Sequence, residues 1–144
     1  MTKLTHTTNC FNTFIRAAED CPARIGEEPP LRAGKPTVAC LQYGMIAKAP
    51  YKYTSDDVIF ATSAPGRELN ANTTNAQKRA AREAFFSRGQ ACMRASSLGK
   101  RFGWGVHADS EGRIAVYAVD SERYQALARD PKLAQVRAMR SKRA

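Results

Sequence analysis

The sequence lacks any long apolar run. No stretch of its 144 residues approaches the length that spans a bilayer, so we expect no membrane-spanning helix and no membrane partner. Residues 1–6 also lack the apolar stretch of a secretory signal. We therefore expect a cytoplasmic protein whose hydrophobic fraction of 43% is ordinary for a globular chain.

Paired cysteines are missing as well. The four cysteines are scattered without a Cys-x-x-Cys pair, at Cys10, Cys21, Cys40 and Cys92. This spacing argues against a zinc ribbon and a dithiol redox motif, and favours reduced cysteines packed as small apolar side chains. Asp56 and Asp57 with His6 and His107 are other candidate metal ligands, but adjacent carboxylates on a strand point to opposite faces. We predict no metal site and no cofactor.

Acidic residues are scarce where basic residues gather. The net charge is +10 and the isoelectric point about 9.9. Between residues 78 and 101, Glu83 is the only acid among Lys78, Arg79, Arg82, Arg88, Arg94, Lys100 and Arg101. After Asp130 the chain carries lysines and arginines but no acid. This charge favours an anionic partner, such as nucleic acid, a phosphorylated small molecule or an acidic protein, although basic tails also serve solubility alone.

The order of elements predicts one α+β domain over residues 1–144, with a basic C-terminal tail from about residue 132. β-favouring residues predict strands at 11–17 and 58–62, although Ser55 before two acids is also typical of a helix cap. Apolar spacing, caps and stops predict helices over residues 36–50, 74–89, 121–130 and 132–142, with a capping box of Thr74 and Gln77 and a cap at Ser121. Lys78, Arg79 and Arg82 would form a basic face of the helix over residues 74–89. We expect an antiparallel sheet of about four strands, including a central β-hairpin, with helices on one face.

The hairpin spans residues 101–119. Residues 101–107 alternate large and small side chains, residues 109–112 form the turn, and residues 113–119 form the return strand. Gly112 is free to take the left-handed conformation that closes such turns. A four-residue loop would pair Trp104 with Tyr117, whereas a three-residue loop with a glycine bulge would pair Trp104 with Ala118.

Two glycines in the first hairpin strand indicate a close contact. Gly103, Gly105 and His107 share one face, opposite Trp104. Glycine weakens a strand, so either a ligand or a helix packed on the sheet is expected to approach over Gly103 and Gly105. The helix is the more common cause.

Cys92 is the strongest candidate nucleophile. Arg88 and Arg94 are near enough in sequence to favour its thiolate, and His107 is a candidate base. No third orienting group is evident, and lone cysteines are most often structural. Residues 103–108 fit G-x-G-x-x-A but lie inside a strand, and residues 97–100 fit S-x-x-K without its companion motifs. A small enzyme using Cys92 with His107 is therefore an alternative hypothesis.

The leading hypothesis is a non-enzymatic binding module for an anionic partner. Its predicted site combines cations and donors beside the hairpin glycines, namely Arg94, Ser96, Lys100, Arg101 and His107. Tyr51, Tyr53 and Trp104 would stack on a ring of the ligand. In the opposing interpretation, Trp104 belongs to the core and the cations form a solvated rim. A third hypothesis is a protein-interaction domain that uses the basic tail.

Several stretches carry a resemblance to a known family. They are HTTN at 6–9, FNTFI at 11–15, EDCP at 19–22, PYKYTSDDV at 50–58, FF at 85–86, GQ at 89–90, CMRAS at 92–96, GWGVH at 103–107 and MRSKR at 139–143. Together they resemble a family of small bacterial proteins filed only as a domain of unknown function. The chain departs from it at residues 61–75 and at Cys10, where an aromatic residue is usual. The resemblance implies a single domain in a bacterial cytoplasm and brings no catalytic residue.

Overall fold

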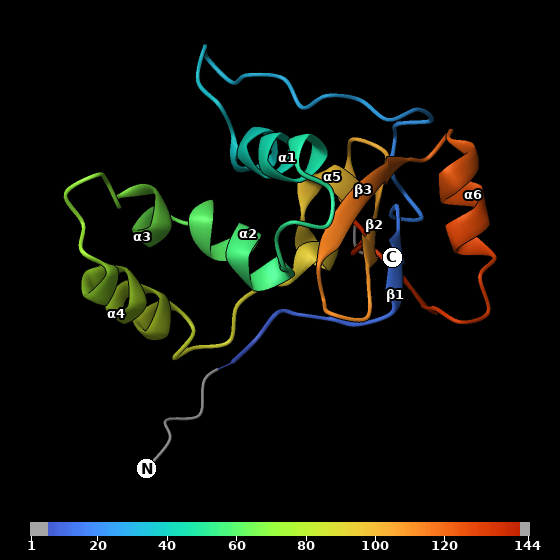
Figure 1. Cartoon of the computed structure of the whole chain (residues 1–144). Coiled ribbons are helices and arrows are strands. Elements are labelled where there is room, and N and C mark those ends of the chain that lie inside the picture. The colour runs from blue at the N-terminus through green and yellow to red at the C-terminus, as the bar shows by residue number, and fades with distance from the viewer. Residues whose placement is uncertain (1–5, 142–144) are drawn as a thin grey trace.

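The computed structural model describes residues 6–141, which form one four-stranded sheet with helices on both faces (Figure 1). The strand order is β3-β2-β1-β4. The elements are β1 (Thr13–Arg16), α1 (Val38–Lys48), α2 (Ser55–Ala61), α3 (Ala64–Arg67), α4 (Asn75–Phe85), the 3-10 helix η1 (Met93–Ala95), α5 (Ser97–Lys100), β2 (Trp104–Ala108), β3 (Ile114–Ala118), α6 (Glu122–Ala128) and β4 (Ala134–Arg137). The predicted α+β class is confirmed.

The central hairpin of β2 and β3 is confirmed, with the register of the three-residue loop. Trp104 pairs with Ala118, and Val106 pairs with Val116. Gly112 has φ +79°, and the Asp109 carboxylate accepts N–H groups from Glu111 and Arg113 across the turn. The hairpin therefore has the three-residue loop with a glycine bulge, which is one of the two turns that the sequence left open.

The sheet is mixed, whereas an antiparallel sheet was predicted. β2 pairs antiparallel with β1 and β3, but β4 runs parallel to β1, with Thr13 opposite Ala134 and Ile15 opposite Val136. The predicted basic helix over residues 132–142 is thus wrong, because residues 134–137 form this edge strand. Pairing with β1 decides its conformation, since an isolated segment of this length gains little from helix formation.

The strand predicted at residues 58–62 is also wrong, because these residues belong mostly to α2. Thr54 and Asp57 form a capping box, in which each side chain accepts the backbone N–H of the other residue. The acids of the first turn also favour the helix N-terminus. These contacts outweigh the β-branched side chains of Val58 and Ile59, which here pack in or against the core.

Helices cover both faces of the sheet, not one as predicted. α1, α2 and α5 contribute Ile46, Val58 and Leu98 to the main core, on the face of Ile15 and Val106. α6 lies on the opposite side of the sheet (Figure 1), where Tyr124 and Leu127 pack on Phe14. The Tyr124 hydroxyl accepts the N–H of Ala17 at 2.9 Å, which ties α6 to the end of β1.

α3 and α4 extend away from the sheet (Figure 1). The predicted capping box of α4 is confirmed, since the side chains of Thr74 and Gln77 each accept the backbone N–H of the other residue. No residue of α4 is buried, and the helix is attached through contacts such as Phe85 on Phe60. None of the helices in residues 6–141 is long and apolar enough to cross a membrane.

Candidate functional site

The structure distributes the predicted site residues over several separate places. Arg94 and Cys92 line one cavity, Arg101 lines two others, and Tyr51 meets His107 on the α6 face of the sheet. Ser96 is buried, and its hydroxyl donates to Gln42 at 2.6 Å. Lys100 ends α5 and is only partly exposed. The single constellation expected from the sequence is therefore not assembled.

The hairpin glycines are covered by the protein itself. A Cβ at Gly105 would lie 2.5 Å from the Phe14 ring and 2.6 Å from the Tyr124 ring of α6. A Cβ at Gly103 would lie 2.5 Å from the carbonyl oxygen of Ile25, and Gly103 has φ +77°. Helix and loop packing, rather than an open ligand surface, thus accounts for both glycines.

Two of the predicted stacking residues contribute to packing. The Trp104 ring lies 5.2 Å from that of Tyr43, and its indole N–H donates to the Glu27 carbonyl at 2.8 Å. Tyr53 packs against the main core, with Lys52 5.3 Å above its ring. The structure therefore places both rings in contacts within the chain.

Tyr51 forms a hydrogen-bonded cluster with His107 and Tyr117. Its hydroxyl lies 2.7 Å from His107 Nδ1 and 2.8 Å from the Tyr117 hydroxyl. Tyr51 has φ +59°, a left-handed conformation that is strained for a bulky residue. Burial, followed by the contact with Tyr117, raises the pKa of Tyr51, so its hydroxyl stays protonated. The cluster fastens the segment before α2 to the hairpin.

We expect His107 to make stability depend on pH. Burial, and then the nearby Arg123, lowers its pKa below the ordinary 6.5, against the opposing effect of Asp109 and Asp130. As pH falls through about 6.5, the unfolded chain takes up a proton at this position before the folded chain does, so stability decreases. Urea unfolding at pH 8 and pH 5.5 should show a larger loss for the wild type than for His107→Gln. Equal losses of stability in the wild type and in His107→Gln would contradict this role of His107.

The structure separates Cys92 from His107. Cys92 and Ile15 line the same cavity, and Ile15 shares its face of the sheet with Val106, its partner in β2. His107 is the next residue of β2, so its side chain points to the opposite face. The proposed nucleophile and base are therefore on different sides of the sheet. No group of three His, Cys, Asp or Glu residues between residues 6 and 141 is placed to hold a metal ion.

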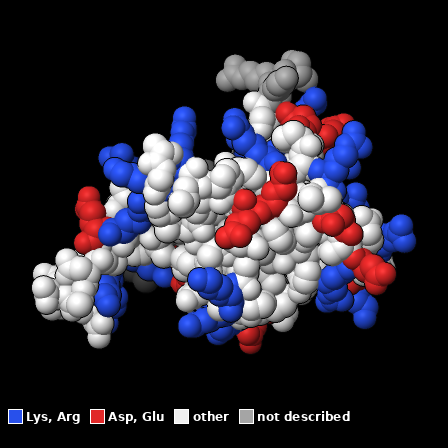
Figure 2. All heavy atoms as spheres, turned by 90° about the horizontal axis from the view of Figure 1, so that it is seen from above, with Lys and Arg blue, Asp and Glu red and all other residues white. Residues whose placement is uncertain are grey.

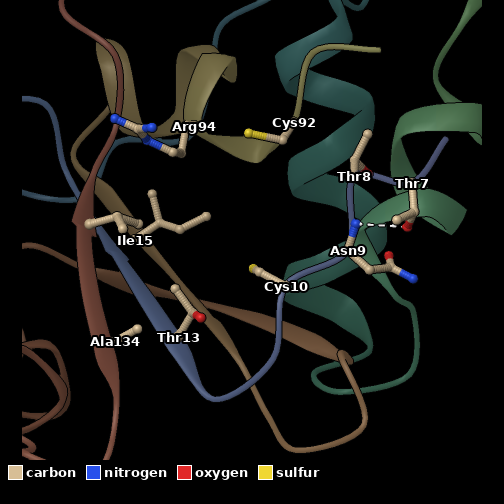
Figure 3. A pocket seen from close by; sticks show the side chains of 10 residues that line it. Thr7, Thr8, Asn9, Cys10, Thr13, Ile15, Cys92, Arg94 and Ala134 are labelled. Carbon is tan, nitrogen blue, oxygen red and sulfur yellow. Dashed lines mark hydrogen bonds between the residues drawn. The ribbon is translucent and has the colours of Figure 1, made fainter. Parts of the chain in front are cut away.

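The Arg94 cavity lies beside the parallel pair β1–β4 and encloses about 350 Å³ (Figure 3). Its apolar floor contains Ile15 and Val136, with the Thr13 side chain beside them. Residues 7–10 form one wall, and Cys92 and Arg94 form the other. This volume suits a small molecule rather than a polymer.

Arg94 is held at this cavity by its own backbone and side chain. Its carbonyl accepts the N–H of Met139 at 2.7 Å, and its Nε donates to the carbonyl of Arg137 at 2.8 Å. Neither terminal NH₂ group has an acceptor among the described residues. These donors have the fork geometry that binds carboxylate or phosphate oxygens.

The opposite wall is fixed by the buried carboxylate of Asp56 at the start of α2. Asp56 accepts the Thr7 hydroxyl at 2.7 Å, and the N–H and hydroxyl of Thr8 at 2.6 and 2.7 Å. In addition, the side-chain oxygen of Asn9 accepts the backbone N–H of Asp56 at 2.9 Å. Residues 7–9 are thus positioned by α2, far away in sequence.

Cys10 and Cys92 both line the cavity, and Figure 3 shows their sulfur atoms pointing into it. Burial raises the pKa of the Cys10 thiol, and the neighbouring Cys92 raises it further, against a smaller effect of Thr13. Cys10 is therefore a protonated, weakly polar lining group at neutral pH. All four cysteines of the chain are free thiols.

Residues 5–144 match the Family of unknown function DUF6157. The chain belongs to this family. No curated protein matches the chain, and no solved structure matches it either. Two stretches that carry the family resemblance, residues 6–9 and 92–96, supply both walls of the Arg94 cavity.

Sequence reasoning identified Arg94 and Cys92 but missed the other wall and the floor of this cavity. The missed residues are Thr7, Thr8, Asn9, Cys10, Thr13, Ile15, Ala134 and Val136. The resembling stretch at residues 6–9 was a usable signal, because it is polar and precedes a strand. Nothing local in the sequence indicates that β4 would join the floor.

Proposed function

We propose that this protein is a non-enzymatic cytoplasmic module that binds a small anionic molecule, such as a phosphorylated metabolite, in the Arg94 cavity. The observation that carries the proposal is the Arg94 guanidinium, which is fixed at Nε and whose two terminal NH₂ groups have no acceptor within residues 6–141. None of the described residues that line the cavity is acidic. An entering anion would therefore meet a preorganised donor and no acidic side chain among the described lining residues.

A binding role is favoured over the enzyme that would use Cys92. The candidate base His107 is on the other face of the sheet and is hydrogen-bonded to Tyr51. The second thiol in the cavity, Cys10, has a raised pKa and is a poor nucleophile at neutral pH. The cavity thus offers recognition groups without an evident acid–base pair.

A small ligand is favoured over nucleic acid. On the face shown in Figure 2, lysines and arginines lie in separate groups with acidic residues among them. On the predicted basic face of α4, Arg82 pairs with Asp57 at 2.8 Å. Only Lys78 and Arg79 remain on this face as cations without an ion pair among the described residues. Burial alone would raise the pKa of Asp57, but the bonds from Thr54 and Arg82 outweigh it and hold this pKa below its ordinary value. Arg82 is therefore engaged in an ion pair with Asp57.

The basic tail is a weaker candidate for an interaction surface. Residues 134–137 are paired with β1, and Ala138 is buried and donates its N–H to the carbonyl of Arg16. Residues 142–144 of the predicted tail lie outside the described residues. Much of the proposed tail is thus an integral part of the sheet.

Arg94→Ala is expected to weaken binding of glycerol 3-phosphate or inorganic phosphate by roughly 10- to 100-fold, because it removes a charge-assisted bidentate contact. Arg94→Lys should retain part of the affinity. Isothermal titration calorimetry at low ionic strength measures both. Arg88→Ala is the matched control, since it removes an exposed charge that does not line this cavity.

Equal losses in Arg94→Ala and Arg88→Ala would reject the cavity as the site. The same titrations with short single- and double-stranded nucleic acids test the polymer alternative. Tight binding that falls steeply with added salt and is unchanged by Arg94→Ala would favour nucleic acid instead.

A further inference from the structure

A second cavity of about 450 Å³ lies between the loop before α1 and the end of α5. Arg32 lies on the loop side and Arg101 on the α5 side, and none of the described lining residues is acidic. Neither arginine forms an ion pair or a side-chain hydrogen bond within residues 6–141. Two unpaired cations therefore face the same solvent-accessible space.

Apolar side chains are exposed at the same cavity. Leu31 is 61% exposed and Val38 is 47% exposed, so both leave apolar surface open to solvent. Both line the cavity together with Pro30 and Phe102. Apolar surface that gathers beside polar groups in this way is typical of binding sites.

The loop wall of this cavity is rigid. Arg32 and Lys35 exchange two backbone hydrogen bonds of 2.8 and 3.0 Å around Ala33 and Gly34, whose φ values are +52° and +78°. These features are those of a tight two-residue turn. The Cys40 thiol of α1 lies 3.3 Å from the carbonyl oxygens of residues 29 and 30 and holds the loop on the helix.

The opposite wall is fixed by α5. The Arg101 N–H donates to the Ser97 carbonyl at 2.8 Å, and the Phe102 N–H donates to the same oxygen at 3.2 Å. On its other side Arg101 borders a smaller cavity with Asp20, whose carboxylate accepts the Ser141 N–H at 3.0 Å. The backbone positions of both arginines are thus set without a ligand.

We propose that this cavity is a second binding site, specific for a carboxylate attached to an aliphatic or aromatic body. The carboxylate would bind between Arg32 and Arg101, and the apolar body would cover Leu31, Val38 and Phe102. Two planar guanidinium groups match carboxylate geometry, and burial of the exposed aliphatic side chains supplies the remaining affinity. This site shares no lining residue with the Arg94 cavity.

Titration calorimetry with three probes at equal ionic strength tests the proposal. Octanoate has both features, octanol lacks the charge, and acetate lacks the apolar chain. We expect octanoate to bind at least tenfold more tightly than octanol or acetate. Arg32→Ala, Arg101→Ala and Leu31→Ser should each weaken octanoate binding by roughly tenfold. Arg88→Ala should leave it unchanged, because Arg88 is exposed and does not line this cavity.

Several outcomes would overturn the proposal. They are no octanoate binding, equal binding of octanol or acetate, and unchanged octanoate affinity in both Arg32→Ala and Arg101→Ala. All substituted positions are exposed, so circular dichroism is expected to show folded variants. Arg94→Ala is expected to weaken glycerol 3-phosphate binding, whereas Arg32→Ala and Arg101→Ala are not, so failure of this site and failure of the Arg94 cavity are distinguishable.

Discussion

Asp56→Ala is expected to lower the free energy of unfolding by about 3 kcal/mol, since hydrogen bonds to a buried charged group are among the strongest in proteins. Asp56 is 8% exposed, and its carboxylate accepts three hydrogen bonds from Thr7 and Thr8. Its removal leaves the buried Thr8 N–H without this acceptor. Urea unfolding monitored by circular dichroism measures the loss.

The same substitution should weaken glycerol 3-phosphate binding, although Asp56 does not line the Arg94 cavity. Loss of a negative charge would by itself favour an anion, so weaker binding would report displacement of residues 7–9. Asp56→Asn is the control, because its remaining oxygen can still accept both bonds from Thr8. It should keep most of the stability and all of the affinity. Equal effects of the two substitutions would contradict this role for residues 7–9.

Gly105→Ala is expected to destabilise the protein by about 2 kcal/mol through overpacking. The added methyl group would lie 2.5 Å from the Phe14 ring and 2.6 Å from the Tyr124 ring. These rings are buried and lie edge to face at 5.0 Å, so neither can move without disturbing the contact between α6 and the sheet. Thermal or urea unfolding measures this effect.

Gly44 provides the matched control for Gly105. It lies inside α1, and a Cβ at Gly44 would meet nothing within 4 Å. Gly44→Ala should therefore stabilise the protein by about 0.5–1 kcal/mol, because alanine is the better helix former and restricts the unfolded chain. A stabilising Gly105→Ala, or a destabilising Gly44→Ala, would refute the packing described for these positions.

Local signals predicted the elements whose stabilising contacts are close in sequence. The hairpin turn at residues 109–112, the capping box of Thr74 and Gln77, and the cap of α6 at Ser121 each depend on residues within four positions of one another. The same holds for α1, which begins after its cap Thr37. In these cases the contacts that stabilise an element lie within the element itself, so the local sequence is enough to predict it.

The wrong predictions concern elements whose conformation depends on distant contacts. Residues 134–137 are a strand because they pair with β1, more than a hundred positions earlier in the chain. The face covered by α6 depends on Phe14 and Tyr124 meeting over Gly105. Residues 58–61 are an exception, because the local capping box of Thr54 and Asp57 favours the helix although the β-branched side chains favour a strand.

The candidate site also combines features that the sequence predicts with features that only the tertiary structure shows. The sequence alone determined that Arg94 and Cys92 belong together, that the chain is strongly basic, and that it resembles a family which the match over residues 5–144 confirms. Only the tertiary structure separated Arg94, Arg101 and His107, placed residues 7–9 opposite Arg94, and brought Arg32 and Arg101 to one cavity. Side-chain chemistry and short-range spacing are properties of the sequence itself. Which distant residues share a cavity follows from strand order and from the face on which each helix packs.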